Sequence, residues 1–338
     1  MRRKDEKHAR GISRRAFLGV TAASFAAPRW THAATDSPKP LEFVTIQAGE
    51  LTAVVGTNAG DATSDHRPGY NGLWSLSSRH ESSPLFLPGI AGLNLEHVVD
   101  GQIAMNDRKA FFEPRNSPMV LCEVTPSGAM LHQPPTPRTG LESWTRFTLR
   151  APYYIDFEFR CVPRKESSPF DYLACFWASY INGPEDKAIY FLGPSSGGLE
   201  RWQQFCSQRH NRDATVRQVD DLFEMRFEPG FQDCLFKDTA LSEIRFSQPF
   251  YYGRFRDMVW IIMFDRAQNL RFTHSPSGGG VTADRHDTNP AWDFQFVIPK
   301  VEVGRQYSLR ATIAYKRWSG RNDVMEEWSA FSIRGRPQ

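Results

Sequence analysis

The stretch YYIDFEFRCV, residues 153–162, alternates between apolar and polar side chains in a way that decides the class of fold. In a β-strand, successive side chains point to opposite faces, so every second residue shares a face. The apolar face is formed by Ile155, Phe157, Phe159 and Cys161. The opposite face carries Tyr154, Asp156, Glu158 and Arg160. This pattern is typical of a strand that buries one face in an antiparallel sheet.

The same pattern recurs along the chain. It is found again in AWDFQFVI (291–298) and YSLRATIAYK (307–316), while MVWIIMF (258–264) is apolar throughout and predicts a central strand covered on both faces. Further strands are predicted at 41–47, 51–56, 72–77, 117–124, 141–149, 171–181, 187–192, 222–228 and 241–249. Segments rich in Gly and Pro separate them, and no stretch keeps a convincing helical period beyond three turns.

We therefore predict an all-β fold, a large antiparallel β-sandwich with few helices. The chain has no internal repeat of fixed period, which argues against a propeller or a β-helix. Residues 34–338 are numerous enough for one large domain, and no low-complexity linker divides them. The segment PPTPRTG (134–140) fits either a domain boundary or a long hairpin loop; we predict a single domain over residues 34–338.

The first 33 residues have the parts of an export signal. A basic start is followed by the uncharged stretch AFLGVTAASFAA (16–27), which is too short to cross a bilayer, and then by small residues. Within the first 33 residues, SRRAFL (13–18) resembles the twin-arginine signal of bacteria. The twin-arginine route exports folded proteins. We predict a twin-arginine signal peptide over residues 1–33, a periplasmic or secreted protein, and a mature chain without a transmembrane segment.

The charge balance changes when the leader is removed. The full chain holds 41 basic and 38 acidic residues, and eight of the basic residues lie before residue 34. The remaining chain is slightly acidic, and no basic block or stripe survives in it. We therefore expect no nucleic-acid partner.

The cysteines and histidines do not form a recognisable cofactor or metal motif. None of the five cysteines forms a CxxC pair, and Cys161 and Cys175 sit in apolar, strand-like runs, so we expect mostly or entirely free, buried thiols. No histidine spacing of a zinc site and no glycine-rich nucleotide motif is present. We predict no metal ligands, and the sequence leaves the cofactor and the oligomeric state undetermined.

Residues that could carry chemistry gather between Asp65 and Arg115. The candidates for acid–base catalysis are Glu96, Glu113, His66 and His97, and those for substrate binding are Arg115, Asn94 and Tyr70. If residues 92–99 form a regular strand, Glu96 faces a groove or solvent and His97 faces the core. A buried, hydrogen-bonded histidine at 97, a surface carboxylate at 96 and a local Glu113–Arg115 ion pair are the structural alternatives.

Aromatic residues beside charges suggest a sugar ligand. In LESWTRF (141–147), Glu142, Trp144 and Arg146 share the polar face of a predicted strand, and Trp177 lies in FWASYI (176–181). Sugars combine apolar C–H faces with hydroxyl rims, which aromatic rings flanked by polar groups can hold. We predict that Trp144 and Trp177 stack on a sugar ring and that Glu142 binds its hydroxyls; packing in a large core is the alternative for these rings.

In size, composition and strand pattern the chain resembles the galactose-mutarotase-like β-sandwich proteins. The resemblance implies a carbohydrate ligand. The function that we predict is acid–base chemistry on a sugar by an exported hydrolase, lyase or epimerase. A glycan-binding protein without catalysis is the first alternative, and a metal-dependent exported enzyme is the second.

Overall fold

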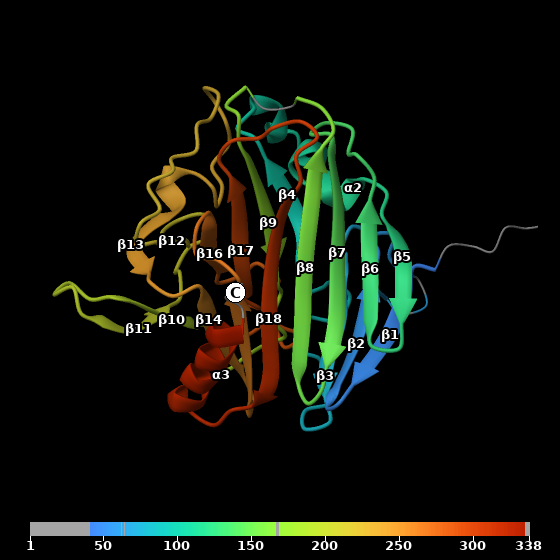
Figure 1. Cartoon of the computed structure of the whole chain (residues 1–338), viewed down its shortest axis with the longest axis vertical. Coiled ribbons are helices and arrows are strands. Elements are labelled where there is room, and N and C mark those ends of the chain that lie inside the picture. Colours follow the sequence, from blue (N-terminus) through green and yellow to red (C-terminus); the bar gives the residue numbers. More distant parts are fainter. Residues whose placement is uncertain (1–40, 62, 64, 167–168, 335–338) are drawn as a thin grey trace, which may run out of the picture. The chain divides into compact units, whose positions relative to one another are not determined.

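The computed structural model describes residues 41–61, 63, 65–166 and 169–334. The predicted signal peptide lies outside these residues, so it stays a prediction. Within the described part, strands dominate and form three sheets (Figure 1). One long helix, α3 (Arg321–Arg334), follows the last strand, and two short ones, α1 (Arg108–Phe111) and α2 (Glu113–Asn116), lie near the middle of the chain.

The largest sheet has nine strands. Their order is β11 (Glu200–Phe205), β10 (Ile189–Pro194), β14 (Phe250–Phe255), β15 (Met258–Phe264), β18 (Tyr307–Arg317), β8 (Tyr154–Pro163), β7 (Leu141–Arg150), β6 (Gly128–Gln133) and β5 (Val120–Thr125). The opening stretch is β8, and its four predicted inward residues are all buried. It pairs antiparallel with β7 and β18 over most of its length, which confirms the predicted alternation.

A six-stranded sheet packs against the nine-stranded one. Its order is β13 (Leu241–Phe246), β12 (Thr215–Gln218), β16 (Leu270–Ser275), β17 (Ala291–Ile298), β9 (Leu173–Ala178) and β4 (Asn94–Val99). Rings from the two sheets meet between them: Phe157 of β8 lies edge-on to Trp177 at 5.8 Å and to Phe294 at 6.0 Å. The two sheets therefore share one aromatic core, as the predicted sandwich requires.

A three-stranded sheet completes the core. It consists of β1 (Phe43–Ala48), β2 (Leu51–Gly56) and β3 (Gly72–Ser78), and its inward side chains Ile46, Val55 and Leu76 join the same buried cluster. Figure 1 shows these strands beside the β5–β7 end of the large sheet. The prediction of a large antiparallel fold is confirmed, with one departure, because β12 and β13 pair in parallel.

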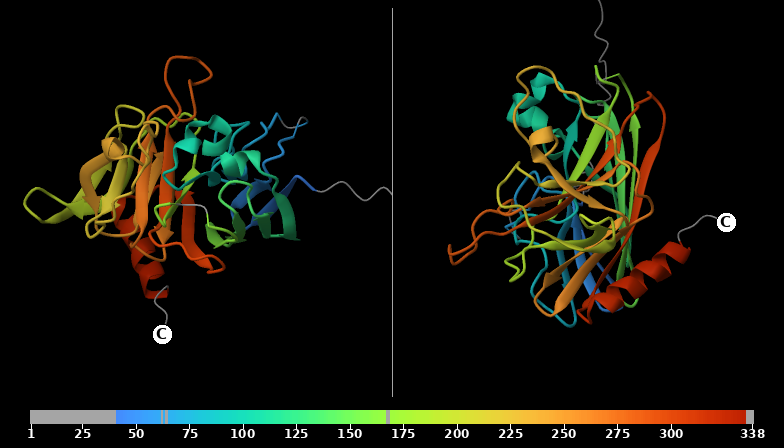
Figure 2. Two further views of the ribbon diagram at one scale, coloured as in Figure 1. Left: turned by 90° about the horizontal axis from the view of Figure 1, so that it is seen from above. Right: turned by 90° about the vertical axis from the view of Figure 1, so that its left-hand side faces the viewer.

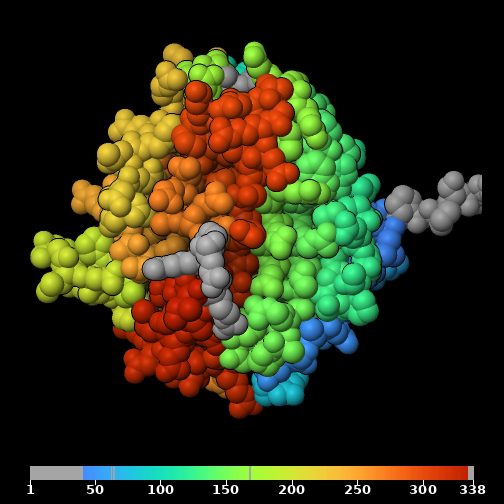
Figure 3. Space-filling model, in the orientation of Figure 1, coloured from blue at the N-terminus to red at the C-terminus, as the bar shows by residue number. Residues whose placement is uncertain are grey.

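The outer face of the nine-stranded sheet is only partly covered. Helix α3 packs Val324 and Trp328 against the buried or half-buried side chains of β14 and β15 (Figure 2). Beside the helix, Figure 3 shows strands β18, β8 and β7 on the surface of this face. The sequence analysis missed this helix, since its apolar and polar residues are only weakly separated around the helix axis. No helix in the described ranges is both long and apolar enough for a membrane span.

The outer face of the six-stranded sheet is covered by loops instead. Segments near residues 102–112 and 223–236 pack on a second apolar cluster that includes Val99, Phe176 and Phe236. Among the cysteines, three are buried, Cys206 is half-buried and Cys122 is exposed, and all five are free thiols. Most of the cysteines are therefore buried, as expected, and Cys122 and Cys206 are the exceptions. The loops enclose the cavity described next.

Candidate functional site

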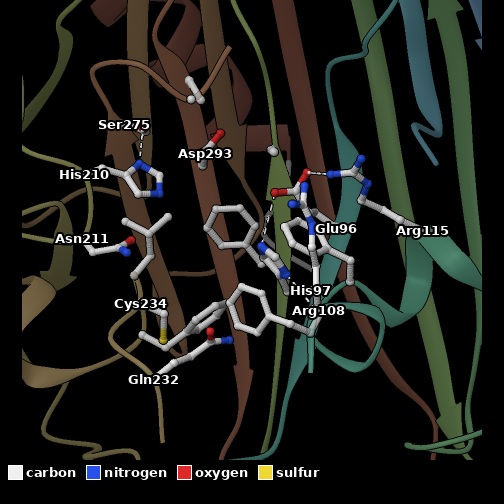
Figure 4. A pocket seen from close by; sticks show the side chains of 18 of the residues that line it. Glu96, His97, Arg108, Arg115, His210, Asn211, Gln232, Cys234, Ser275 and Asp293 are labelled. Carbon is white, nitrogen blue, oxygen red and sulfur yellow. Dashed lines mark hydrogen bonds and ion pairs between the residues drawn. The ribbon is translucent and has the colours of Figure 1, made fainter. Parts of the chain in front are cut away.

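A cavity of about 480 Å³ lies on the loop-covered face of the six-stranded sheet (Figure 4). Its floor is formed by strand residues: Glu96 and His97 of β4, Phe176 of β9, Ser275 of β16 and Asp293 of β17. Its walls come from Arg115 of the short helix α2 and from the loops that carry Tyr70, His210, Gln232 and Phe236. This hollow combines buried acids, histidines and aromatic rings, which is the composition of a small-molecule site.

A β-bulge in β4 turns two consecutive side chains into the cavity. Leu95 pairs with Trp177 and His97 pairs with Phe176, so Glu96 is an extra residue without a partner on β9. In a regular strand Glu96 and His97 would point to opposite faces, but the extra residue re-aims one of them. Leu95 faces the core between the sheets, whereas both Glu96 and His97 line the cavity. The expected core position of His97 is therefore wrong, and the bulge is the reason.

Glu96 is the centre of a hydrogen-bond network. Its Oε2 accepts from Tyr180 Oη at 2.5 Å, Asn94 Nδ2 at 3.0 Å and Arg115 Nη1 at 3.2 Å. Its Oε1 lies 3.2 Å from Nε2 of His97. Burial alone would raise the pKa of this carboxyl, but the hydrogen bond and charge of His97, with Arg115 and Tyr180, outweigh burial and lower the pKa. Glu96 is therefore a carboxylate at neutral pH.

His97 is fixed by its second nitrogen. Its Nδ1 lies 2.8 Å from the carbonyl oxygen of Phe111, which can only accept, so Nδ1 carries a proton. Its Nε2 faces the carboxylate of Glu96, and this contact is favourable when a second proton lies between the two atoms. The rings of Phe111 and Phe112 pack on the imidazole at 4.1 and 4.6 Å. The orientation of His97 toward Glu96 is thus held from both sides.

Asp293 is a second buried acid in the same cavity. Its Oδ1 accepts from the backbone N–H of Ser179 at 2.9 Å, and only 1% of the residue is exposed. Burial raises the pKa of Asp293 well above its ordinary value; the Ser179 bond opposes this shift, while the nearby charge of Glu96 adds to it. Figure 4 shows Asp293 between His210 and Glu96. Two carboxyl groups in one cavity therefore have pKa values displaced in opposite directions.

His210 lines the cavity opposite β4 (Figure 4). Its Nδ1 lies 2.8 Å from Oγ of the buried Ser275. Burial lowers the pKa of His210, as does the charge of His97, against the opposing effect of Glu96. The imidazole is therefore neutral at neutral pH and can accept or relay a proton.

Arg115 and Tyr70 form one wall of the cavity. The Arg115 guanidinium lies 3.9 Å from the centre of the Tyr70 ring and 4.8 Å from that of Phe112. Its Nε donates to the carbonyl of Gly69 at 2.9 Å, which leaves Nη1 directed at Glu96. Both residues were predicted to bind substrate, and the structure brings both to the cavity. Their assignment to binding stays a prediction.

Asn94 lies behind Glu96 and does not line the cavity. Its Oδ1 accepts from Nδ2 of the buried Asn71 at 2.9 Å, which directs its own Nδ2 at Glu96. Asn71 in turn bonds the backbone of Leu95 through both ends of its amide. Asn94 is therefore placed to orient the carboxylate rather than to touch a ligand.

Two predicted catalytic residues lie elsewhere. His66 stacks on Trp74 with ring centres 3.7 Å apart and bonds the carbonyl of Tyr70 at 2.9 Å through Nε2. Glu113 accepts from Thr139 Oγ1 at 2.8 Å and from the backbone N–H groups of Arg138 and Thr139. Both side chains hold loops together, and neither lines the cavity. They are not part of the site that we describe.

The predicted aromatic platform is also dispersed. Trp177 is fully buried in the core between the sheets, so it has no face available to a sugar. Trp144 and Glu142 lie on the outer face of the nine-stranded sheet, where Arg160 covers the Trp144 ring at 4.5 Å and His132 stacks on it at 4.9 Å. Glu142 pairs there with His132 and Arg164. The aromatic walls of the cavity come from other residues, namely Tyr70, Phe111, Phe112, Phe176, Tyr180 and Phe236.

The sequence analysis missed Asp293 and His210 as site residues. Asp293 was read as one polar position of an alternating strand, but the loops bury that face as well. His210 lies in a turn-rich segment and no spacing connects it to β4. The one available signal was a carboxylate in a strand of otherwise apolar and amide side chains. In the described ranges, no three His, Cys, Asp or Glu side chains form a group that could hold a metal ion.

No protein-family profile and no curated protein sequence matches the chain. Solved structures with a similar course of the chain include a galactose mutarotase-like protein from Lactobacillus casei, at 10% identity and a TM-score of 0.45, covering 81% of this chain and 99% of that one. A GalM/aldose epimerase homologue from C. elegans aligns at 10% identity and a TM-score of 0.46, covering 82% and 99%. Heparan sulfate lyase HepC from Pedobacter heparinus aligns at 10% identity and a TM-score of 0.42, covering 83% of this chain and 36% of the lyase. At these scores the similarities define neither a family nor an activity for this chain.

Proposed function

We propose that the cavity binds a saccharide and performs acid–base catalysis on it. The observation that carries this proposal is the pair of buried carboxyl groups, with the pKa of Glu96 lowered and that of Asp293 raised. Two titratable groups whose environments push their pKa values apart can serve as base and acid at the same pH. Cleavage of a glycosidic bond by hydrolysis or elimination and ring opening by an epimerase all need this pair.

The two acids divide the work by their protonation state. The protonated carboxyl of Asp293 is the donor to the oxygen whose bond to carbon breaks. The carboxylate of Glu96 is the acceptor, or the stabiliser of positive charge at carbon, and His97 and Arg115 hold it in place. The neutral imidazole of His210 can relay a proton between substrate and solvent. The aromatic side chains of Tyr70, Phe112 and Phe236 offer apolar surface to a sugar ring.

Glycan binding without catalysis is the second candidate function. It is favoured by one observation: each Glu96 oxygen already has partners within the protein, through His97, Arg115, Asn94 and Tyr180. A carboxylate so fully bonded can serve as a fixed wall of a binding site. The two candidates differ in whether a bound sugar is changed.

The deciding experiment tests the full chain for both binding and turnover on a panel of glycosides, free aldoses and uronic-acid oligosaccharides. The same panel is repeated with Asp293→Asn, which cannot donate a proton. Catalysis predicts turnover that Asp293→Asn lowers about 10²- to 10⁴-fold while binding persists. Binding without turnover would leave only the glycan-binding function. If no member of the panel is bound or turned over, the proposal is overturned.

We also propose that the protein acts outside the cytoplasm, because Arg14 and Arg15 resemble the twin-arginine export signal. A reporter fused behind residues 1–33 should be exported. The fusion with Arg14→Lys and Arg15→Lys together should stay in the cell. Retention of the unchanged fusion in the cytoplasm would refute this assignment.

A further inference from the structure

A second hollow adjoins the cavity. A groove of about 640 Å³ shares three residues with the cavity wall, namely Arg108, Phe112 and Arg115. Its remaining lining includes Asn58, Asp107, Lys109 and Asn116. A ligand longer than one sugar that leaves the cavity over Arg108 and Phe112 would reach this groove.

Two cations at this border are not neutralised by the protein. Within the described ranges, neither Arg108 nor Lys109 has an ion pair, and both are exposed. The Arg108 guanidinium lies 5.7 Å from the centre of the Phe112 ring, which gives its flat face a support. Figure 4 shows Arg108 and Arg115 on the same side of the cavity as Glu96. Arg108 thus lies beside the acid–base site, and Lys109, its neighbour in the chain, lines the adjoining groove.

The acids nearby are already engaged. Glu96 is paired with Arg115 and His97. Asp107 faces the groove, but its Oδ1 accepts from the backbone N–H groups of Lys109 and Ala110 at 2.9 and 3.0 Å. Burial raises the pKa of Asp293 well above its ordinary value, which favours its neutral form. Asp233, which also lines the cavity, is paired with Arg212 at 3.7 Å. Asp107 keeps its negative charge, so Arg108 and Lys109 together leave a net positive charge at the border, which a neutral sugar chain would leave without a partner.

We propose that the substrate is an anionic oligosaccharide, and that Arg108 and Lys109 bind an acidic group on the sugar next to the reacting one. This inference rests on the proposed function of the cavity. A planar guanidinium supported by an aromatic ring suits a carboxylate, which it can bind through two parallel hydrogen bonds. A sulfate ester offers the same kind of oxygens, so the acidic group is a carboxylate or a sulfate.

The test compares matched charged and neutral chains. Oligomers of galacturonate, of mannuronate and guluronate, and of unsulfated chondroitin are each compared with their carboxyl-reduced forms, and chondroitin is also compared with its sulfated form. If the acidic group is a carboxylate, at least one uronate oligomer should bind at least tenfold more tightly than its carboxyl-reduced form. If it is a sulfate, only sulfated chondroitin should bind at least tenfold more tightly than its unsulfated form. This preference should weaken as ionic strength rises.

Substitutions of Arg108 and Lys109 test whether these two residues cause the preference for anionic chains. Arg108→Gln should weaken binding of the preferred anionic chain about tenfold and that of the neutral chain less than twofold, with Lys109→Gln a smaller step in the same direction. Arg108→Lys should restore part of the loss. Arg201→Gln removes an equally exposed arginine on β11, away from the cavity, and should change neither. The melting temperature of each variant confirms that it is folded.

The outcomes separate this inference from the proposed function. If neutral chains bind and turn over as well as charged ones, or Arg108→Gln affects both equally, the anionic substrate is refuted and the acid–base site stands. If no chain of either kind and no simple sugar binds or turns over, the proposed function fails, and this inference fails with it.

Discussion

The outer faces of the two large sheets both carry charged and aromatic residues, but one face is open to solvent and the other is covered. On the nine-stranded sheet, β7 and β8 alternate regularly, and the outward side chains pair across strands, as Trp144 does with Arg160 and Glu142 with His132. Solvent reaches this face in a hollow of about 320 Å³. On the six-stranded sheet a bulge and covering loops bury Glu96 and Asp293. Two buried carboxyl groups with pKa values displaced in opposite directions thus meet on the face where alternation is broken and covered.

Two carboxylates provide the sharpest contrast between the faces. Glu96→Gln should lower kcat/KM about 10³-fold, or about 4 kcal/mol in activation free energy, because the amide can neither accept a proton nor carry the charge. Glu142→Gln removes a hydrogen-bonded carboxylate of the open face and should change kcat/KM less than twofold. Both variants are measured on the substrate that the panel identifies. Equal effects would mean that the cavity holds no special acid–base pair.

Two tryptophans contrast the core with the open face. Trp177 is fully buried and touches Phe157, Phe159 and Phe294, so Trp177→Ala should lower the free energy of unfolding by about 3–4 kcal/mol. Trp144→Ala should cost about 1 kcal/mol, since its ring is only half-buried. Denaturant unfolding measures both. If Trp177→Ala lowers the free energy of unfolding only slightly but weakens sugar binding, Trp177 belongs to the binding site after all.

A buried histidine extends the contrast to pH. His274 of β16 is completely buried, and burial lowers its pKa from 6.5 to about 4. Below pH 6.5 the unfolded chain takes up the proton first, so this contribution to stability is full above pH 6.5 and is lost as the pH falls to about 4. The loss amounts to about 3 kcal/mol.

Comparison with a variant isolates this effect from other titrating groups. Between pH 7 and pH 4, the free energy of unfolding of His274→Gln should fall by about 3 kcal/mol less than that of the wild type. Parallel curves for the wild type and His274→Gln would show that the burial of His274 does not couple folding to protons.

The sequence predicted the regular face well and the bulged face poorly. Alternation in residues 153–162 places β8 and its buried side chains, because each inward residue has an apolar partner across a regular ladder. In NLEHVV (94–99) the same rule assigned His97 to the core, since a bulge leaves no mark in the sequence by itself. Trp177 was assigned to the sugar site because it lies in the aromatic segment FWASYI, but both faces of its strand are buried.

The cavity joins segments that are distant in the chain. Glu96, His210 and Asp293 come from β4, a loop and β17, and only the order of the strands in the six-stranded sheet brings them together. Local patterns determine strands and faces, whereas the pairing of β4 with β9 and of β9 with β17 is a tertiary choice. Neighbouring residues such as Glu113 and Arg115 shared a motif instead, and the structure sends them to different partners.

The smallest expected effect comes from Asn94, which lies behind Glu96. Its substitution tests whether the hydrogen bonds to Glu96, and not only the bulge that positions it, keep the pKa of Glu96 low. Asn94→Ala removes the 3.0 Å hydrogen bond to Oε2 and should raise the pKa of Glu96. A base must be unprotonated, so the acidic limb of the pH–rate profile should move to higher pH, and kcat/KM at neutral pH should fall about tenfold or less. Asn182→Ala removes a comparable bond to the carbonyl of Pro84, outside the cavity, and should leave the profile unchanged. A lower rate with an unmoved acidic limb would mean that Asn94 only supports the strand, and that His97, Arg115 and Tyr180 suffice to keep Glu96 charged.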